Sequence, residues 1–349
     1  MSSTKSTLNS KKAPLRKWSF KDVKEASVTH HNGAFFWLSL SFLLLFSSSS
    51  LAQSFFQLDE KDNQLHFSYH WDDFDGNQNA IEFSAHKKDF LEPLKRYRGF
   101  NRERSQRELS RQLNRYIRQQ NWRGIQAKLT PRQQSVELVT SRARNQEQQT
   151  QLEQYKRRLR EYYNERWIDY LDSNFYESIS LPPGERGIIP DHAAIASEME
   201  NVIKPLINAI GEQLGDNTQR NYINYVTSFL QQIPYNELTN KLDSRGDGFT
   251  PPNQLIYYNQ GDCDSKVTLM TAIMRNIINN AKMAIIYLPE HAVFGINISK
   301  RDSDTTIEHE GIQYVLVDVT GPAAMPAGTV GEDTEFHIRT GQYTVKPVN

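Results

Sequence analysis

The sequence predicts an α+β fold: a helix that bears the only cysteine packs on an antiparallel sheet, and a β-hairpin and long basic amphipathic helices precede this core. Apolar residues recur at helical spacing from Asp262 onward. Three runs rich in β-branched and aromatic residues then follow, and no helical segment lies between them. Strands without a crossover helix pair most economically as antiparallel neighbours.

Residues 1–52 are expected to form a signal peptide or an N-terminal anchor. The apolar run Ala34–Phe46 has 13 residues, fewer than the ~20 that a membrane-spanning helix needs, and Ser50-Leu51-Ala52 resembles a small-x-small cleavage site. An uncleaved anchor is the alternative, because the basic leader is long and the serines at 47–50 could extend a weak span. Both alternatives place the bulk of the chain in the periplasm or outside the cell, and the second also ties it to the membrane.

Residues 53–94 are expected to contain a β-hairpin. Leu65–Tyr69 and Ala80–Ser84 alternate between apolar and polar side chains. Asp75-Gly76-Asn77 lies between them, and these residue types tolerate the positive φ of tight turns.

Residues 95–180 are expected to form two basic amphipathic helices. The apolar positions at helical spacing are Leu109, Leu113, Tyr116 and Ile117 in the first and Leu152, Tyr155, Leu159, Tyr162 and Tyr163 in the second. A break is expected near Gly124–Pro131. The whole chain carries 41 basic and 41 acidic residues, but residues 95–166 carry 19 basic against 7 acidic ones.

This basic segment suggests two kinds of role. Arginines interleaved with Gln and Glu on a long helix usually form a solvated face, which is the interpretation we favour. The alternative is contact with an anionic surface or a protein partner through residues 95–166. Nucleic acid is not the expected partner, because an exported protein meets little of it.

Residues 181–349 are expected to form the catalytic unit. Pro182-Pro183-Gly184 marks its start, since paired prolines with glycine resist both helix and central strand. Helical periodicity covers 192–214 and 218–233, and the helix that begins at Asp262 follows a loop rich in glycine and proline. The expected strands are Met283–Leu288, Ala292–Ile298 and Ile312–Val319.

Cys263 opens the helix after Gly261-Asp262, and a cysteine there is a candidate nucleophile. Unpaired N–H groups and the helix dipole at this position are expected to stabilise its thiolate and to lower its pKa. A thiol nucleophile needs a base, and the base needs an orienting acceptor. His291 and Asp318 follow in that order, at the expected start of one strand and near the end of another. Each alone has a structural explanation, and it is their combination that favours catalysis.

Three motifs together resemble the bacterial transglutaminase-like superfamily, which has a papain-related fold. They are Gly-Asp-Cys-Asp-Ser-Lys at 261–266, Glu-His-Ala-Val-Phe-Gly-Ile at 290–296 and Leu-Val-Asp-Val-Thr-Gly-Pro at 316–322. The resemblance covers about residues 190–335 and implies that Cys263 is the nucleophile, His291 the general base and acid, and Asp318 the residue that orients the imidazole. The backbone N–H of Cys263, and secondarily Gln260, are the candidates for stabilising an oxyanion.

These observations predict an exported thiol hydrolase, a cysteine peptidase or amidase, whose substrate is a protein or peptide. The alternatives are a transglutaminase, in which an amine resolves the same thioester, and a non-catalytic transglutaminase-like binding module of the cell envelope. No cofactor and no metal are expected, because the sequence has no Walker-type loop, no His-Glu-x-x-His and no paired cysteines.

Overall fold

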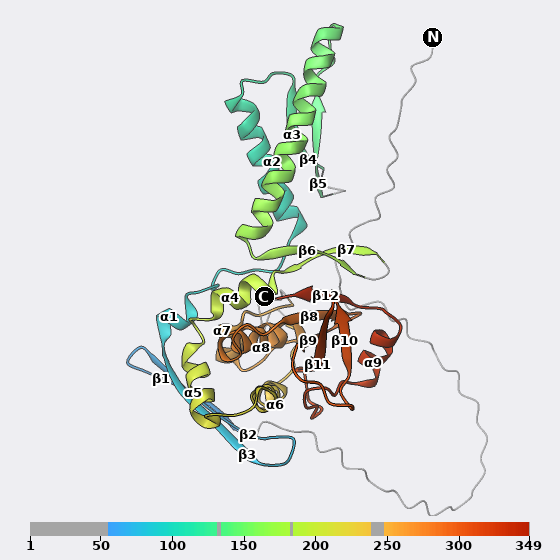
Figure 1. Ribbon diagram of the computed structural model, residues 1–349. Helices are drawn as coiled ribbons and strands as arrows, with labels where there is room; N and C mark the ends of the chain where they lie inside the picture. Colours follow the sequence, from blue (N-terminus) through green and yellow to red (C-terminus); the bar gives the residue numbers. More distant parts are fainter. Residues whose placement is uncertain (1–54, 131–133, 182–183, 239–247, 349) are drawn as a thin grey trace, which may run out of the picture.

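The computed structural model describes residues 55–130, 134–181, 184–238 and 248–348, which form an α+β fold (Figure 1). The predicted signal peptide or anchor at 1–52 lies outside the described residues. None of the helices in the described part of the chain is long and apolar enough to cross a bilayer.

The C-terminal sheet has five strands in the order β10-β11-β9-β8-β12, and every neighbouring pair is antiparallel, as predicted. Three of these strands match the predicted runs, while β10, β12 and the helix α9 (Glu332–Arg339) were not expected. The strands are β8 (Met283–Leu288), β9 (His291–Ile296), β10 (Thr306–His309), β11 (Ile312–Val317) and β12 (Thr344–Pro347).

The helix α8 (Cys263–Ile277) lies at the centre of the body, between this sheet and four other helices (Figure 1). Residues Ser265–Met274 are all buried, so α8 is covered on every side. The surrounding helices are α4 (His192–Met199), α5 (Lys204–Leu214), α6 (Gln219–Gln232) and α7 (Pro252–Tyr258). The sequence prediction did not include α7.

The single helix predicted over 192–214 is wrong, because the structure has two helices there, α4 and α5. Pro205 is the second residue of α5. A proline is tolerated in the first turn of a helix, where its missing N–H has no intrahelical acceptor, but within a continuous helix it would break the hydrogen-bond ladder. The chain therefore starts a new helix at this proline.

The N-terminal sheet contains the predicted hairpin, β2 (Gln64–Asp72) with β3 (Gln78–His86), and an additional edge strand, β1 (Phe55–Lys61). The short helix α1 (Lys87–Leu91) follows. The Tyr69 hydroxyl donates to the Ile256 carbonyl at 2.8 Å, and Trp71 Nε1 donates to Ser228 Oγ at 3.0 Å. This sheet thus shares one core with α6 and α7 rather than forming a separate unit.

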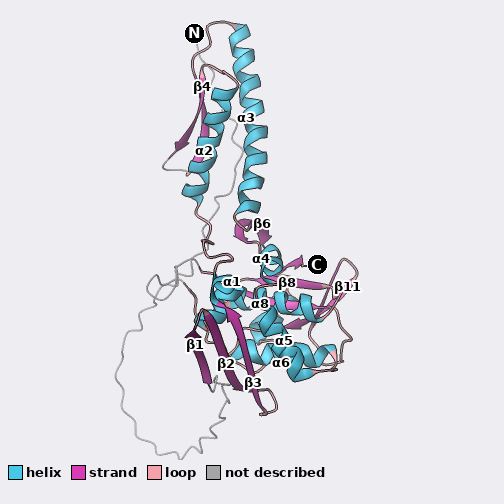
Figure 2. Cartoon of the chain, turned by 90° about the vertical axis from the view of Figure 1, so that its left-hand side faces the viewer, coloured by secondary structure: helices cyan, strands magenta, loops and turns pink. Residues whose placement is uncertain are grey.

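An arm built from α2 (Arg102–Gln119) and α3 (Gln146–Ser173) stands away from the body (Figures 1 and 2). The predicted break between these helices is itself a hairpin, β4 (Ile125–Thr130) with β5 (Ser135–Thr140). The arm has its own core, which includes Leu113, Leu152 and Leu159.

A further hairpin, β6 (Tyr176–Leu181) with β7 (Glu185–Pro190), joins the arm to the body. The predicted domain boundary between residues 180 and 181 falls within this hairpin. Its two strands pair with each other, beginning with Tyr176 opposite Pro190. Arm and body are therefore connected through paired strands.

Candidate active site

Cys263 is the first residue of α8, and the chain just before it is held tightly. The Asp262 side chain caps the helix by accepting from the Ser265 N–H at 2.8 Å. The Gly261 N–H donates to the Pro234 carbonyl at 3.2 Å. A Cβ at Gly261 would lie 2.7 Å from Leu255 Cδ1, so a side chain does not fit there. These contacts fix the direction in which the thiol leaves the helix.

His291 and Asp318 are brought together by the antiparallel pairing of β9 and β11. His291 begins β9, Asp318 directly follows β11, and Val317 pairs with Phe294. His291 Nε2 lies 2.8 Å from Asp318 Oδ2, and Asp318 Oδ1 accepts from the Thr320 N–H at 2.9 Å. Both oxygens of this carboxylate are thus engaged.

The thiol of Cys263 lies beside the start of β9. The backbone N–H of Ala292, the residue after His291, interacts with the sulfur, and Asp264 Oδ1 accepts from the thiol at 3.5 Å. His291 Nδ1, the ring nitrogen that Asp318 does not contact, has no hydrogen-bond partner among the residues of the described ranges. That nitrogen is unengaged, and it belongs to the residue just before the Ala292 N–H that reaches the sulfur.

The contact between His291 and Asp318 shifts the pKa of each group in the direction expected for a base and the carboxylate that orients it. Burial acts to lower the pKa of His291, but the hydrogen bond and charge of Asp318 outweigh it, and the pKa is raised. Burial acts to raise the pKa of Asp318, but the contacts with His291 and Thr320 leave it lowered. Asp318 therefore stays ionised and stabilises the imidazolium form of His291.

The predicted lowering of the Cys263 pKa is wrong for this structure. Burial, followed by the negative charges of Asp264 and Asp262, raises the pKa of the thiol well above its ordinary value, although the Ala292 N–H acts to lower it. The helix position alone does not decide the charge of the sulfur, because two carboxylates share that end of α8. The resting thiol is protonated, and a base has to remove its proton.

Lys266, one turn further along α8, is fully buried beside these groups. Its Nζ donates to the Ile233 and Thr320 carbonyls, each at 2.6 Å. Burial lowers the pKa of this ammonium to about 7, although the charges of Asp318, Asp262 and Cys263 act to raise it. Lys266 thus ties the first turn of α8 to the end of α6 and to the loop that follows Asp318.

The structure adds one aromatic residue to the site that sequence reasoning missed. Burial raises the pKa of Tyr235 to about 12, and the charges of Cys263 and of the acidic groups around it act in the same direction. Tyr235 is 51 % exposed and pairs with Gly261 in an isolated parallel bridge. No local motif marks it, because the bridge joins segments that are separated in the sequence.

The two predicted oxyanion candidates differ in their surroundings. Cys263 is the first residue of α8, so its N–H belongs to the first turn, which has no intrahelical acceptor. The side chain of Gln260 accepts from Asn236 Nδ2 at 3.0 Å, which holds the amide in place. Tyr258, also close in sequence, is 58 % exposed and packs edge-on against Tyr257.

Within the described ranges, no group of three His, Cys, Asp or Glu side chains lies close enough together to hold a metal ion. Comparisons of this chain with protein-family models, with curated proteins and with solved structures found no match. The chemistry of the site therefore has to be argued from its geometry. That geometry provides a candidate nucleophile with a backbone N–H donor at its sulfur, and a histidine that a carboxylate orients and that has one unengaged ring nitrogen.

Proposed function

We propose that this protein is an exported thiol hydrolase with a transglutaminase-like, papain-related core, in which Cys263, His291 and Asp318 cleave an amide bond of a protein or peptide. The observation that carries the proposal is the 2.8 Å contact between His291 Nε2 and Asp318, which leaves Nδ1 unengaged, while the N–H of the next residue, Ala292, interacts with the Cys263 sulfur. An imidazole that is held in one tautomer by a buried carboxylate can act as a general base.

The reaction proceeds in two steps. His291 Nδ1 takes the thiol proton while the Cys263 sulfur attacks the carbonyl carbon, and the C=O electrons move to oxygen. When the carbonyl re-forms, the C–N bond breaks, and His291 passes its proton to the departing amine. Water then attacks the thioester, His291 accepts the water proton, and the C–S bond breaks to give a carboxylic acid and the free thiol. If an amine replaces water, the same steps make a transglutaminase.

The raised pKa of Cys263 favours a second candidate, a non-catalytic binding module of the cell envelope with the same core. Cys263 is half-buried by its accessible surface, and a half-buried, protonated cysteine without a working base would act as a small apolar residue. The two candidates differ in whether His291 controls the reactivity of the sulfur.

Alkylation of Cys263 by iodoacetamide separates these candidates, and the chain has a single cysteine, so the label reports one site. We expect the folded protein to react at pH 7 to 8 at least roughly tenfold faster than His291→Ala, because a neutral His291 can take the proton of a thiol whose own pKa is raised. His337→Ala, at a half-buried histidine of α9 outside the site, is the control. Equal rates for the protein and His291→Ala, or labelling only after unfolding, would favour the binding module.

Tyr235→Phe tests whether the phenol hydroxyl donates to the oxyanion. We expect acylation by p-nitrophenyl acetate to slow roughly tenfold, less than for a fully buried donor because Tyr235 is half exposed. Alkylation by iodoacetamide forms no oxyanion and should keep its rate. Tyr258→Phe is the matched control, and an equal loss in both variants or in both reactions would contradict this role.

A further inference from the structure

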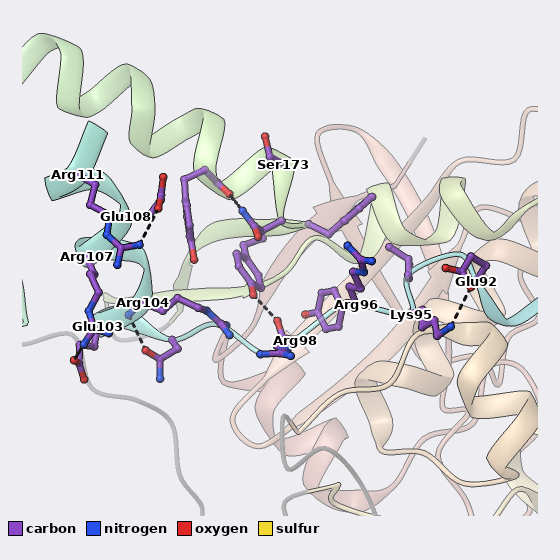
Figure 3. Close-up of a pocket in the computed structure, with 17 residues that line it drawn as sticks. Glu92, Lys95, Arg96, Arg98, Glu103, Arg104, Arg107, Glu108, Arg111 and Ser173 are labelled. Atoms are coloured by element: carbon purple, nitrogen blue, oxygen red, sulfur yellow. Dashed lines mark hydrogen bonds and ion pairs between the residues drawn. The ribbon is translucent and has the colours of Figure 1, made fainter. Parts of the chain in front are cut away.

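A hollow of about 910 Å³ lies at the base of the arm, between the segment that enters α2 and the residues that join α3 to β6 (Figure 3). Its lining includes three glutamates and six basic residues. The basic residues are Lys95, Arg96, Arg98, Arg104, Arg107 and Arg111. The excess of positive charge makes the hollow a candidate site for an anionic ligand.

All three glutamates of the hollow already have basic partners, which lie towards its two ends in Figure 3. Glu92 pairs with Lys95 at 3.1 Å, Glu108 pairs with Arg111 at 3.8 Å, and Glu103 pairs with Arg107. These partners are i,i+3 or i,i+4 neighbours, so the pairs form within the lining itself.

Three arginines in the middle of the hollow, Arg96, Arg98 and Arg104, form no ion pair with a carboxylate among the described residues. All three are exposed, and of their three guanidinium groups only that of Arg104 forms a hydrogen bond within the described part of the chain, to the Gly99 carbonyl at 2.7 Å. An exposed guanidinium without a partner presents a planar fork of donors that fits a carboxylate. The centre of the hollow therefore provides three guanidinium groups that no carboxylate engages, although one N–H of Arg104 is already used by the Gly99 carbonyl.

The floor beneath these arginines is aromatic. Tyr97 and Tyr176 are buried, with their ring centroids 6.1 Å apart, and the Tyr176 hydroxyl donates to the Arg98 carbonyl. Phe175 and Tyr170 complete this part of the lining. A ligand that fills the hollow would thus place apolar groups on the floor and acidic groups along the rim.

We propose that this hollow binds an acidic peptide segment in which apolar side chains are interspersed among the carboxylates. The proposal rests on the proposed function, since the segment would belong to the protein substrate. The wall of the hollow is fixed to α7, which leads directly to Cys263, by Gln254 Nε2 to the Leu94 carbonyl at 3.2 Å and Asn253 Nδ2 to the Phe90 carbonyl at 2.7 Å. A segment docked there is therefore held against the same unit that carries the nucleophile.

The lining favours a peptide over a membrane or a densely charged polymer. A flat bilayer reaches protruding surfaces, whereas these arginines surround a recess. A polymer with a charge on every unit would also meet the three glutamates, which would repel it. A peptide with spaced acidic residues places each carboxylate on an arginine and each apolar side chain on the floor.

The test is binding of a short fluorescein-labelled peptide of repeated Glu-Glu-Leu units to the full chain, measured by fluorescence anisotropy. Binding is measured in Cys263→Ala, in which the proposed chemistry is absent, so the result does not depend on catalysis. We expect Arg96→Glu/Arg98→Glu/Arg104→Glu to weaken binding roughly ten- to a hundredfold. The control is Arg115→Glu/Arg157→Glu/Arg160→Glu, which makes the same charge change at exposed arm residues outside the hollow.

Equal losses in the two triple variants, or equal affinity for a Lys-Lys-Leu peptide, would overturn the proposal. A hollow variant that loses heparin or anionic vesicles but keeps the peptide would overturn the choice of ligand. Acylation of Cys263 by p-nitrophenyl acetate, measured in the hollow variant with its cysteine intact, should stay unchanged. If the peptide binds and this acylation is absent from the unaltered protein, the proposed function fails and the docking site stands.

Discussion

Asp318→Asn is expected to slow acylation of Cys263 by p-nitrophenyl acetate roughly a thousandfold or more at neutral pH. The carboxylate holds His291 with its proton on Nε2, at 2.8 Å from Asp318 Oδ2, and so keeps Nδ1 as an acceptor. An amide at this position reverses that arrangement, because the other oxygen of Asp318, Oδ1, already accepts a hydrogen bond.

The Thr320 N–H donates to Asp318 Oδ1 at 2.9 Å, so the oxygen of an introduced amide has to occupy that side. The amide NH₂ then faces His291 Nε2 and can only donate to it. Neutral His291 would carry its proton on Nδ1, where it cannot take the proton of the thiol. Asp318→Asn is therefore expected to slow acylation because His291 adopts the wrong tautomer, and not because packing around the site is lost.

Asp302→Asn, at an exposed aspartate, removes the same charge and serves as the control. Thermal unfolding should show that both variants remain folded. The explanation fails if Asp318→Asn keeps an acylation rate within a few-fold of the unaltered protein, because Asp318 would then be only a capping residue of the turn that follows β11.

Lys266→Met is expected to change how the stability of the fold depends on pH. Burial lowers the pKa of Lys266 to about 7 in the folded state, whereas the unfolded chain keeps the ordinary value near 10.5. Between these values the unfolded state binds more protons, so the lysine makes the unfolding free energy rise as the pH increases. Across the whole interval the rise is on the order of 5 kcal/mol.

The measurement is urea unfolding of the protein and of Lys266→Met from pH 6.5 to pH 10. The unfolding free energy of the unaltered protein should increase relative to that of Lys266→Met as the pH rises. Below about pH 7 the difference between the two should not change with pH. Lys282→Met, at an exposed lysine, should show no such trend. A difference that does not depend on pH would mean that Lys266 stays charged in the fold, stabilised by its two carbonyl acceptors.

The core of the site follows from sequence because its signals are local. Asp262 is recognisable as a helix cap and Cys263 as the residue that it exposes. The run of strands without a crossover helix predicts antiparallel pairing, which in turn predicts that the start of one strand, at His291, meets the end of another, at Asp318. The structure has this contact between His291 and Asp318.

Other features depend on contacts between distant segments, which a single sequence does not display. The charge of Cys263 depends on how deeply it is buried and on where the Asp264 carboxylate points. The burial of Lys266 requires the end of α6 and the Thr320 carbonyl, and the place of Tyr235 requires its bridge to Gly261. Strands β4 and β5 were missed because their arginine- and glutamine-rich surroundings resemble an interrupted helix.

The packing of the N-terminal sheet on α6 and α7 has a consequence for how the chain folds. The contacts of Trp71 with Ser228 and of Tyr69 with Ile256 join residues 157 and 187 positions apart. Contacts of such separation form slowly, because a long loop has to close first. During synthesis the apolar face of β2 emerges well before its partners, so the nascent chain carries an aromatic surface that invites aggregation or a chaperone until α7 has been made.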